Sequence, residues 1–371
     1  MRVLMLSKAL VAGTSQRKLE EIAKCPGVEL TLVTPPYWLS DDGSQQKLER
    51  LYTTGYQMIE TSMKRNGNFH LHSYPELGKI MREVRPEIVH IDEEPYNLAT
   101  WQAMRLSKQL KAKALFFTWQ NLYRKYPPPF RQFELYNYHN ASMALAGNRD
   151  AVDVLKKKGY QGPIRVIPQF GFDTEIYKRA TPRPLRQPSD PFTVGFIGRL
   201  KEEKGLTLIV EALSLLPANC RAVFVGHGPM RSILEEQAQR LGVTERVTFK
   251  ENVPSYEVVN EIQQLDAHIL PSLSRPNWIE QFGRILAECM SCETPVIGSN
   301  SGEIPYVIGD AGLIFPEGNA QQLSVAIKKL MDDPELAAEL ARKGRQRVIE
   351  NYTQTQIARQ TYDAYCEMLK A

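Results

Sequence analysis

The chain has 371 residues, which is too long for a single ordinary hydrophobic core, so two domains are expected. Hydrophobic residues make up 43% and charged residues 24%, a composition typical of a soluble, folded protein rather than a disordered one. The formal net charge is only +4, which is compatible with an anionic ligand or an acidic surface but does not indicate a protein that binds nucleic acid.

The first residues, MRVLMLSKALVAG, share an early arginine and an apolar run with signal peptides. Ser7 and Lys8 interrupt this run, and the sequence contains no apolar stretch of membrane-spanning length. VLML is therefore interpreted as a first buried strand, and a cytoplasmic protein is expected.

Cysteine and histidine residues do not indicate a metal site. The cysteines are odd in number and mostly scattered, which favours a reducing compartment. Cys289 and Cys292 form the sequence CMSC, for which a redox or zinc site is considered. The sequence has no second CxxC pair and no nearby pair of histidines to complete a metal site. The alternative is two small apolar residues on the buried side of a helix. His70 and His72 also lack a third ligand and are interpreted as a surface pair.

In the first half, short apolar runs alternate with amphipathic stretches. A helix is predicted at 15–24, and another after Asn148, which is suited to cap it, with Gly159 at its end. This alternation predicts parallel βα units in which helices cover both faces of a sheet. The predicted strands lie at 2–7, 28–35, 88–91, 114–119, 141–147 and 164–168.

Four prolines within 181–191 predict a linker or a surface loop, after which the strand–helix pattern restarts. Later strands are predicted at 192–197, 220–226, 247–250, 267–272, 295–299 and 312–316, and helices at 204–216, 230–240 and 334–369. The sequence thus predicts an α/β protein with a first domain at 1–175, a linker at 176–190, a second domain at 191–350 and a C-terminal helix at 351–371.

The turn after the strand ending at Ile197 carries two basic residues, Arg199 and Lys204, beside the start of a helix. Ligands of open α/β sheets bind at the carboxyl ends of the strands, and Arg and Lys supply donors and charge for a phosphate. The turn therefore indicates a phosphate site, with a solvated basic turn as the alternative. GHGP (226–229) lacks the third glycine of a dinucleotide fingerprint and is interpreted as a tight turn. The sequence also lacks a Walker A loop and a D-x-D triplet for a nucleotide-bound metal.

Two carboxylates bracket the segment EQFGRILAE. Glu280 is predicted to lie in a loop before a helix that follows Gly283, and Glu288 within that helix. The helix start between them offers free amides and the positive end of its dipole, where a phosphate can bind. Carboxylates accept hydrogen bonds from vicinal hydroxyls, so this pattern fits a sugar–diphosphate–nucleoside. The alternatives are an acidic residue that is favourable near a helix start and a solvated helix position.

With these motifs in place, the second half resembles the donor-binding domain of family 4 of the retaining glycosyltransferases, which have the GT-B architecture. The resemblance rests on E-x7-E from Glu280 to Glu288, on GRL…KG at 198–205, and on the order of motifs from Pro271 to Pro316. It implies two Rossmann-like domains facing a cleft, with a last helix, from about 354, that crosses back to the first domain. It also implies a hexosyltransferase type of enzyme (EC 2.4), acting in polysaccharide, glycolipid or small-glycoside synthesis.

The resemblance assigns roles to residues of this chain. Gly198, Arg199 and Lys204 would hold the donor diphosphate, and Glu280 the transferred sugar, so that Arg199, Lys204 and Glu280 would be the catalytic group. Glu288 would bind the ribose hydroxyls. The remaining donor-binding residues implied are Gly13, Asn252, Val253, Gln281, Phe282, Gly283 and Arg284. The donor would be a UDP- or GDP-sugar, with no cofactor and no metal.

Two departures from the family pattern stand out. The family often has paired glycines in the first loop, where this chain reads Val11-Ala12-Gly13. Many members have a histidine near the reaction centre, where this chain has Gln120 in TWQN. Because Gln cannot take a proton at neutral pH, a general base at this position is in doubt, which fits a mechanism in which the leaving phosphate receives the acceptor proton.

The acceptor is expected to be a hydroxyl compound bound to the first domain. Asp92, Glu93 and Glu94 end a predicted strand, and one of them, with Glu94 as the candidate, is predicted to bind acceptor hydroxyls. YRKYPPPFRQF (123–133) is interpreted as an acceptor contact, as a membrane-facing segment at the inner membrane face, or as a stiff loop that closes the cleft. Two rivals stay open: a GT-B sugar-nucleotide epimerase, and a catalytically silent protein that binds sugar nucleotides.

Overall fold

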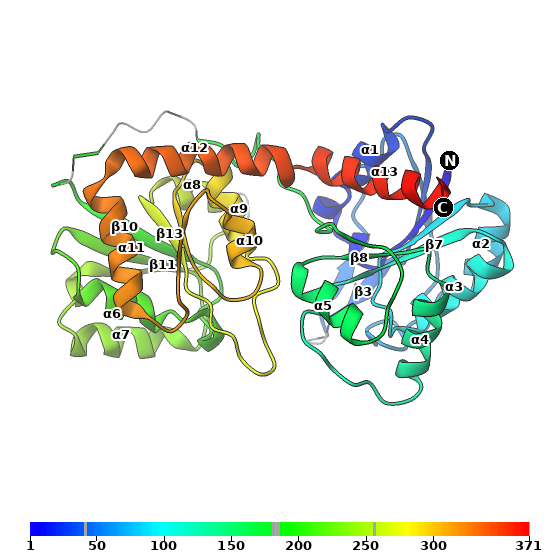
Figure 1. Cartoon of the computed structure of the whole chain (residues 1–371), viewed down its shortest axis with the longest axis horizontal. Coiled ribbons are helices and arrows are strands. Elements are labelled where there is room, and N and C mark those ends of the chain that lie inside the picture. The colour runs from blue at the N-terminus through cyan, green and yellow to red at the C-terminus, as the bar shows by residue number, and fades with distance from the viewer. Residues whose placement is uncertain (41–42, 180, 182–185, 188, 255–256, 371) are drawn as a thin grey trace. The chain divides into compact units, whose positions relative to one another are not determined.

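The computed structural model describes residues 1–371 apart from 41–42, 180, 182–185, 188, 255–256 and 371 (Figure 1). By its internal contacts the chain divides into two compact units. Unit 1 comprises Met1–Gly171 and Gln354–Ala371, and unit 2 comprises Phe172–Thr353. Residues 180, 182–185 and 188 of the predicted linker lie outside the described residues.

Unit 1 contains a seven-stranded sheet in the order β5-β2-β1-β6-β7-β8-β9. All of its strand pairs are parallel, and in the middle of the sheet Leu4 pairs with Thr31 on one side and Val89 on the other. The strands are β1 (Arg2–Leu6), β2 (Glu29–Thr34), β5 (Gln57–Glu60), β6 (Ile88–Ile91), β7 (Lys113–Thr118), β8 (Met143–Ala146) and β9 (Ile164–Val166).

Helices cover both faces of this sheet because successive strand residues point to opposite sides. Val3 and Met5 of β1 pack in a core with α1 (Arg17–Ala23) and α13 (Gln354–Lys370). Leu4 and Leu6 belong to the opposite core. That second core also contains residues of α2 (Leu77–Val84), α3 (Leu98–Gln109), α4 (Phe130–Asn140) and α5 (Arg149–Lys157).

The C-terminal helix belongs to the first unit. In Figure 1, α13 (red) lies beside α1 (blue), and Ile357, Tyr365 and Met368 are buried in the same core as β1. The long predicted helix at 334–369 is therefore two helices, α12 (Pro334–Asn351) and α13, separated at residues 352–353. The predicted crossing of the last helix back to the first domain is confirmed.

Unit 2 contains a six-stranded parallel sheet in the order β12-β11-β10-β13-β14-β15. Its strands are β10 (Phe192–Ile197), β11 (Cys220–Val225), β12 (Val247–Lys250), β13 (Ala267–Leu270), β14 (Val296–Ser299) and β15 (Leu313–Phe315). Its other helices are α6 (Thr207–Ser214), α7 (Met230–Arg240), α8 (Val258–Gln263), α9 (Arg284–Ser291), α10 (Ile304–Ile308) and α11 (Ala320–Asp332). The predicted α/β class with two Rossmann-like sheets is confirmed.

Several local predictions agree with the structure. The side chain of Asn148 caps α5 by accepting a hydrogen bond from the Ala151 amide at 2.8 Å, and Gly159 has a φ of 95° just after the helix. Cys289 and Cys292 are both fully buried at α9. No helix among the described residues is both long and apolar enough to span a membrane.

The reading of His70 and His72 as a surface pair is wrong for one of the two. His72 is fully buried, whereas His70 is partly exposed. The sequence analysis also left unassigned the small antiparallel pair of β3 (Tyr37–Leu39) and β4 (Gln45–Lys47), and the edge strand β5.

Candidate functional site

A cavity of about 430 Å³ opens in unit 2 where β10 and β13 end and α9 begins. This is the edge of an open parallel sheet at which ligands bind. The cavity brings together residues that are far apart in the sequence. The predicted site residues that line it are Gly198, Arg199, Lys204, Glu280, Gln281, Gly283 and Arg284.

The turn that carries Arg199 is supported by the neighbouring GHGP turn. The Gly198 amide donates to the Val225 carbonyl at 2.9 Å, and the Leu200 amide donates to the His227 carbonyl at 2.8 Å. A Cβ on Gly226 would lie 2.1 Å from the Gly198 carbonyl oxygen, so only glycine permits this approach. GHGP is thus a tight turn, as predicted, and it holds the wall of the cavity.

Lys204 and Glu280 are in direct contact within the cavity. The Lys204 ammonium donates to Glu280 Oε2 at 2.6 Å, and the Ser272 hydroxyl donates to the same oxygen at 3.0 Å. The Lys204 Nζ also lies 4.8 Å from the centroid of the Trp278 ring, within the range of a cation–π contact. Lys204, which is predicted to bind the diphosphate, and Glu280, which is predicted to bind the transferred sugar, therefore form one ion pair.

The start of α9 contributes to the same cavity. Gly283 precedes this helix with a φ of 77°, a backbone conformation that side-chain-bearing residues rarely adopt. Gly283, Arg284 and Ile285 line the cavity, so the first turn of the helix faces it. The amides of a helix start and its positive dipole favour an anion there.

Glu288 lies within α9, as predicted, but does not line this cavity. It is 7% exposed and forms an ion pair with Arg284 at 3.4 Å and a hydrogen bond with Tyr177. Burial raises the pKa of Glu288 above its usual value, against the opposing effects of Arg284 and Tyr177.

Three other predicted donor residues also lie outside the cavity lining. Phe282 is buried and packs between Phe172 and Tyr352, with ring centroids 6.2 Å and 5.4 Å away. Asn252 and Val253 follow β12 in a segment without regular structure. For Phe282, the structure indicates a packing residue of unit 2.

In unit 1, the amide that was expected to approach a phosphate is already occupied. Gly13 begins a short 3-10 helix, and its amide donates to Glu49 Oε2 at 2.7 Å. A Cβ on Gly13 would lie 2.6 Å from the Leu51 side chain, so the residue is also closely covered.

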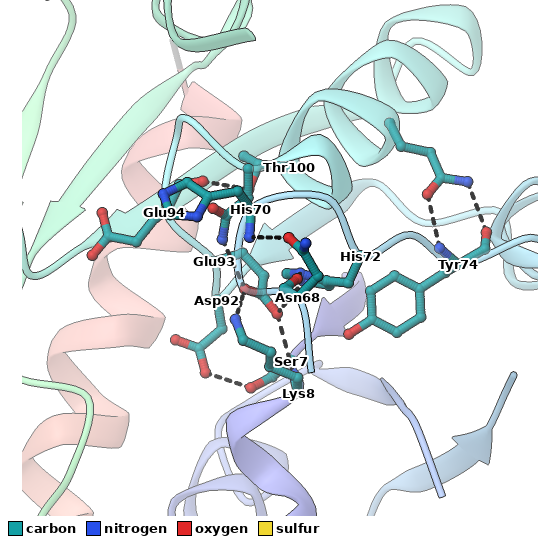
Figure 2. Close-up of polar contacts among 12 residues, drawn as sticks. Ser7, Lys8, Asn68, His70, His72, Tyr74, Asp92, Glu93, Glu94 and Thr100 are labelled. Atoms are coloured by element: carbon teal, nitrogen blue, oxygen red, sulfur yellow. Dashed lines mark hydrogen bonds and ion pairs between the residues drawn. The ribbon is translucent and has the colours of Figure 1, made fainter. Parts of the chain in front are cut away.

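Buried charges gather where β1 and β6 end (Figure 2). Ser7 donates to Asp92 Oδ2 at 2.7 Å, and Lys8 forms an ion pair with Glu93. The His72 Nε2 lies 3.4 Å from Glu93 Oε1. Burial alone would raise the pKa of Glu93, but Lys8 and His72 lower it to about 2.

Glu94 is held by the end of the next strand, β7. Its Oε2 accepts from the Thr118 hydroxyl at 2.6 Å, and its Oε1 accepts from the Trp119 amide at 2.8 Å. Burial raises the pKa of Glu94 to about 7, although both donors oppose this rise. Both oxygens are thus engaged within unit 1, and binding of an acceptor by Glu94 stays a prediction.

Gln120 belongs to a second buried network that the sequence did not indicate. Its Oε1 accepts from Lys158 Nζ at 2.9 Å, and Lys158 also donates to Glu134 at 2.5 Å. Within the described part of the chain, the buried Gln120 Nε2 donates to no acceptor. In the predicted acceptor segment, the ring of Tyr126 packs against Tyr96 at a tilt of 32°, with the ring centroids 4.2 Å apart.

Trp278 and Lys158 are the residues that sequence reasoning missed. Trp278 lies in the loop before Glu280. An aromatic side chain two residues from a candidate ligand-binding residue could have indicated that Trp278 belongs to the site. Lys158 lies at the end of α5, and nothing in the sequence connects it to Gln120, which is 38 positions away.

Comparison with known proteins shows what the second unit is similar to. Residues 178–347 match the model of the family described as Glycosyl transferases group 1. The chain is 28% identical over 246 residues to alpha-maltose-1-phosphate synthase of Mycolicibacterium smegmatis, a match covering 59% of this chain and 61% of that protein. The chain thus spans less than two thirds of that relative's length.

Two solved structures share the whole fold. Anabaena Alr3699/HepE in complex with UDP aligns with a TM-score of 0.70 at 18% identity, covering 99% of this chain and 100% of that one. Sucrose-phosphate synthase from Thermosynechococcus elongatus aligns with a TM-score of 0.68 at 18% identity, covering 100% and 99%. The chain therefore has the GT-B fold, and over residues 178–347 its second unit is similar to the group 1 glycosyltransferases.

Proposed function

We propose that the protein is a retaining, metal-independent glycosyltransferase of family 4 that moves a sugar from a nucleotide diphosphate sugar to a hydroxyl acceptor. The observation that carries this proposal is the unit 2 cavity, in which Arg199, Lys204, Glu280 and the start of α9 converge. The match of residues 178–347 to group 1 glycosyltransferases supports it.

The cavity provides complementary groups for the two parts of such a donor. Arg199, Lys204 and the first amides of α9 offer positive charge and donors to a diphosphate. Glu280 offers a carboxylate to the hydroxyls of the transferred sugar. Glu288, buried on the same helix, is the proposed partner of the ribose hydroxyls.

The proposed reaction breaks the bond between the anomeric carbon and the leaving diphosphate oxygen through an oxocarbenium-like state. Negative charge grows on the diphosphate as the bond breaks, and Arg199 and Lys204 stabilise it where it develops. The acceptor hydroxyl then bonds to the anomeric carbon on the same face, and its proton passes to the leaving phosphate. Gln120 would hydrogen-bond the reactants without taking that proton.

A UDP-sugar is the first donor to test, because the similar Anabaena protein was solved with UDP. The experiment is a thermal-shift screen of UDP-, GDP- and ADP-sugars, with and without EDTA, on the wild type and on Glu288→Ala. We expect stabilisation by one nucleotide class that is insensitive to EDTA and is lost in the variant. Stabilisation that disappears with EDTA would contradict the metal-independent mechanism.

The two rivals are separated by following the donor sugar itself. Incubation with the stabilising donor and a panel of hydroxyl acceptors, analysed by mass spectrometry and NMR, should give a glycoside with the donor's anomeric configuration. A changed sugar without any acceptor would indicate an epimerase. Binding without turnover for every acceptor would favour the silent binding protein.

A further inference from the structure

We propose that Glu280 makes the unit 2 cavity select the intact sugar nucleotide over the free nucleoside diphosphate that remains after transfer. The inference rests on the proposed function and concerns the same cavity. It starts from the ion pair that occupies the place where the diphosphate would bind.

The Lys204–Glu280 pair is held in a fixed position. The Ser272 hydroxyl donates to Glu280 Oε2 at 3.0 Å, and the Ser272 carbonyl accepts from the Ser299 hydroxyl at 2.6 Å. The main chain of Glu280 is fixed as well, because its carbonyl accepts from the Glu303 amide at 3.1 Å. Glu280 therefore cannot move far from Lys204 without breaking several contacts.

The pair is also accessible to a ligand. The Lys204 side chain is 22% exposed and the Glu280 side chain 10%, and both residues line the cavity with Trp278. The centroid of the Trp278 ring lies 4.8 Å from the Lys204 ammonium. A ligand that enters the cavity thus meets a lysine that already has an anionic partner.

A diphosphate must compete with Glu280 for this lysine. An ionised carboxylate only accepts hydrogen bonds, so it offers a phosphate oxygen nothing but like-charge repulsion. Sugar hydroxyls can donate to the same carboxylate and replace the contact that it loses from Lys204. The Glu280 carboxylate therefore weakens the binding of a free nucleoside diphosphate but not that of a diphosphate linked to a sugar. The selectivity comes from repulsion of the wrong ligand.

This selection favours turnover. After transfer, the sugar no longer shields Glu280, and the carboxylate can regain Lys204 as the nucleoside diphosphate leaves. Because release of product limits the rate of many enzymes, an internal competitor for the leaving diphosphate shortens the time that the site stays occupied.

The test is calorimetric titration of the full chain with UDP and with UDP-glucose, and with GDP and GDP-mannose in parallel, on the wild type and on Glu280→Gln. Gln keeps the shape of the side chain, removes its charge and can donate to a phosphate. We expect Glu280→Gln to bind the free diphosphate of the recognised base about 10-fold more tightly and its sugar nucleotide no more tightly. Equal or weaker binding of the free diphosphate by Glu280→Gln would overturn the proposal.

Two further variants make the outcome decisive. Glu339→Gln removes a carboxylate from an exposed pair with Lys343 on α12, at 2.8 Å, and should leave both affinities unchanged. Lys204→Met should act in the opposite direction, weakening the free diphosphate more than the sugar nucleotide, and carries the test if Glu280→Gln does not fold. Absence of binding of both the sugar nucleotides and the free nucleoside diphosphates by the wild type would overturn the proposed function together with this inference.

Discussion

Each unit has a lysine–glutamate pair at the carboxyl edge of its parallel sheet, but the two pairs differ in their surroundings. In unit 1, the side chains of Lys8 and Glu93 are 11% and 0% exposed, and His72 contacts the same carboxylate (Figure 2). In unit 2, Lys204 and Glu280 are more exposed and line a cavity. We therefore expect the buried pair to serve stability in unit 1, and the pair that lines the cavity is the one proposed to bind a ligand in unit 2.

The largest effect should come from breaking the buried pair. Glu93→Gln leaves Lys8 and His72 without their carboxylate in a buried environment, and we expect it to lower the free energy of unfolding by about 3 kcal/mol. Urea denaturation followed by circular dichroism measures this change. The matched variant Glu280→Gln should cost less, because its partner Lys204 is 22% exposed whereas Lys8 is 11% exposed. Equal losses in the two variants would remove the distinction between the pairs.

Substitutions in the unit 2 cavity should have the opposite outcome, in which activity is lost and the free energy of unfolding is kept. Arg199→Ala removes a cation that the proposed mechanism places on the leaving diphosphate, and we expect kcat to fall about 100-fold or more. Initial rates with the donor identified by the thermal-shift screen measure this fall, with Lys343→Ala on α12 as the control for lost positive charge. Near-normal turnover in Arg199→Ala would rule out its assignment.

Glu94 should make unit 1 sensitive to pH. Burial raises its folded-state pKa to about 7, whereas an unfolded glutamate titrates near 4.5. The folded state therefore binds this proton more tightly than the unfolded state does. The resulting contribution of Glu94 to the free energy of unfolding is fully present below about pH 4.5 and is lost as the pH rises through 7. We expect the wild type to lose up to about 3 kcal/mol relative to Glu94→Gln between pH 5 and pH 8.

Unfolding free energies of the two proteins at each pH measure that difference. Their comparison is needed because buried His90 and His268 act with the opposite sign. Burial lowers the pKa of His90 to about 4 and of His268 to about 3, so their contribution to stability grows as the pH rises from these values to 6.5. A difference between wild type and Glu94→Gln that does not change with pH would contradict the prediction.

The fold was largely predictable because the central strands are apolar runs. β6 coincides with IVHI at 88–91, and α7 has the predicted bounds. The strands that were missed lie away from the centre of the sheets, where burial imposes no such pattern: β4 is exposed throughout, and both end residues of β5 are exposed. An edge strand that contacts the core on one side only leaves too weak a periodicity to detect in four residues.

The candidate site was predictable only as separate parts. Arg199 and Lys204 could be found because they stand in the turn that follows a strand, and Glu280 because it precedes a helix start. Their mutual arrangement could not be found, since Lys204 and Glu280 are 76 positions apart and nothing in a single sequence records that two oppositely charged residues meet. The contact of Lys158 with Gln120 was hidden for the same reason.

The smallest effect is expected when the residues that cap two helices, one in each unit, are replaced. Asn148 caps α5 and is fully buried, whereas Asn319 caps α11 from an exposed position, and each side chain accepts one backbone amide. Replacement by Ala removes the same hydrogen bond, which we expect to cost about 1 kcal/mol at Asn319. The cost at Asn148 should be larger, because water cannot reach the orphaned Ala151 amide. Thermal denaturation of both variants measures the difference, and equal costs would mean that burial adds nothing to this cap.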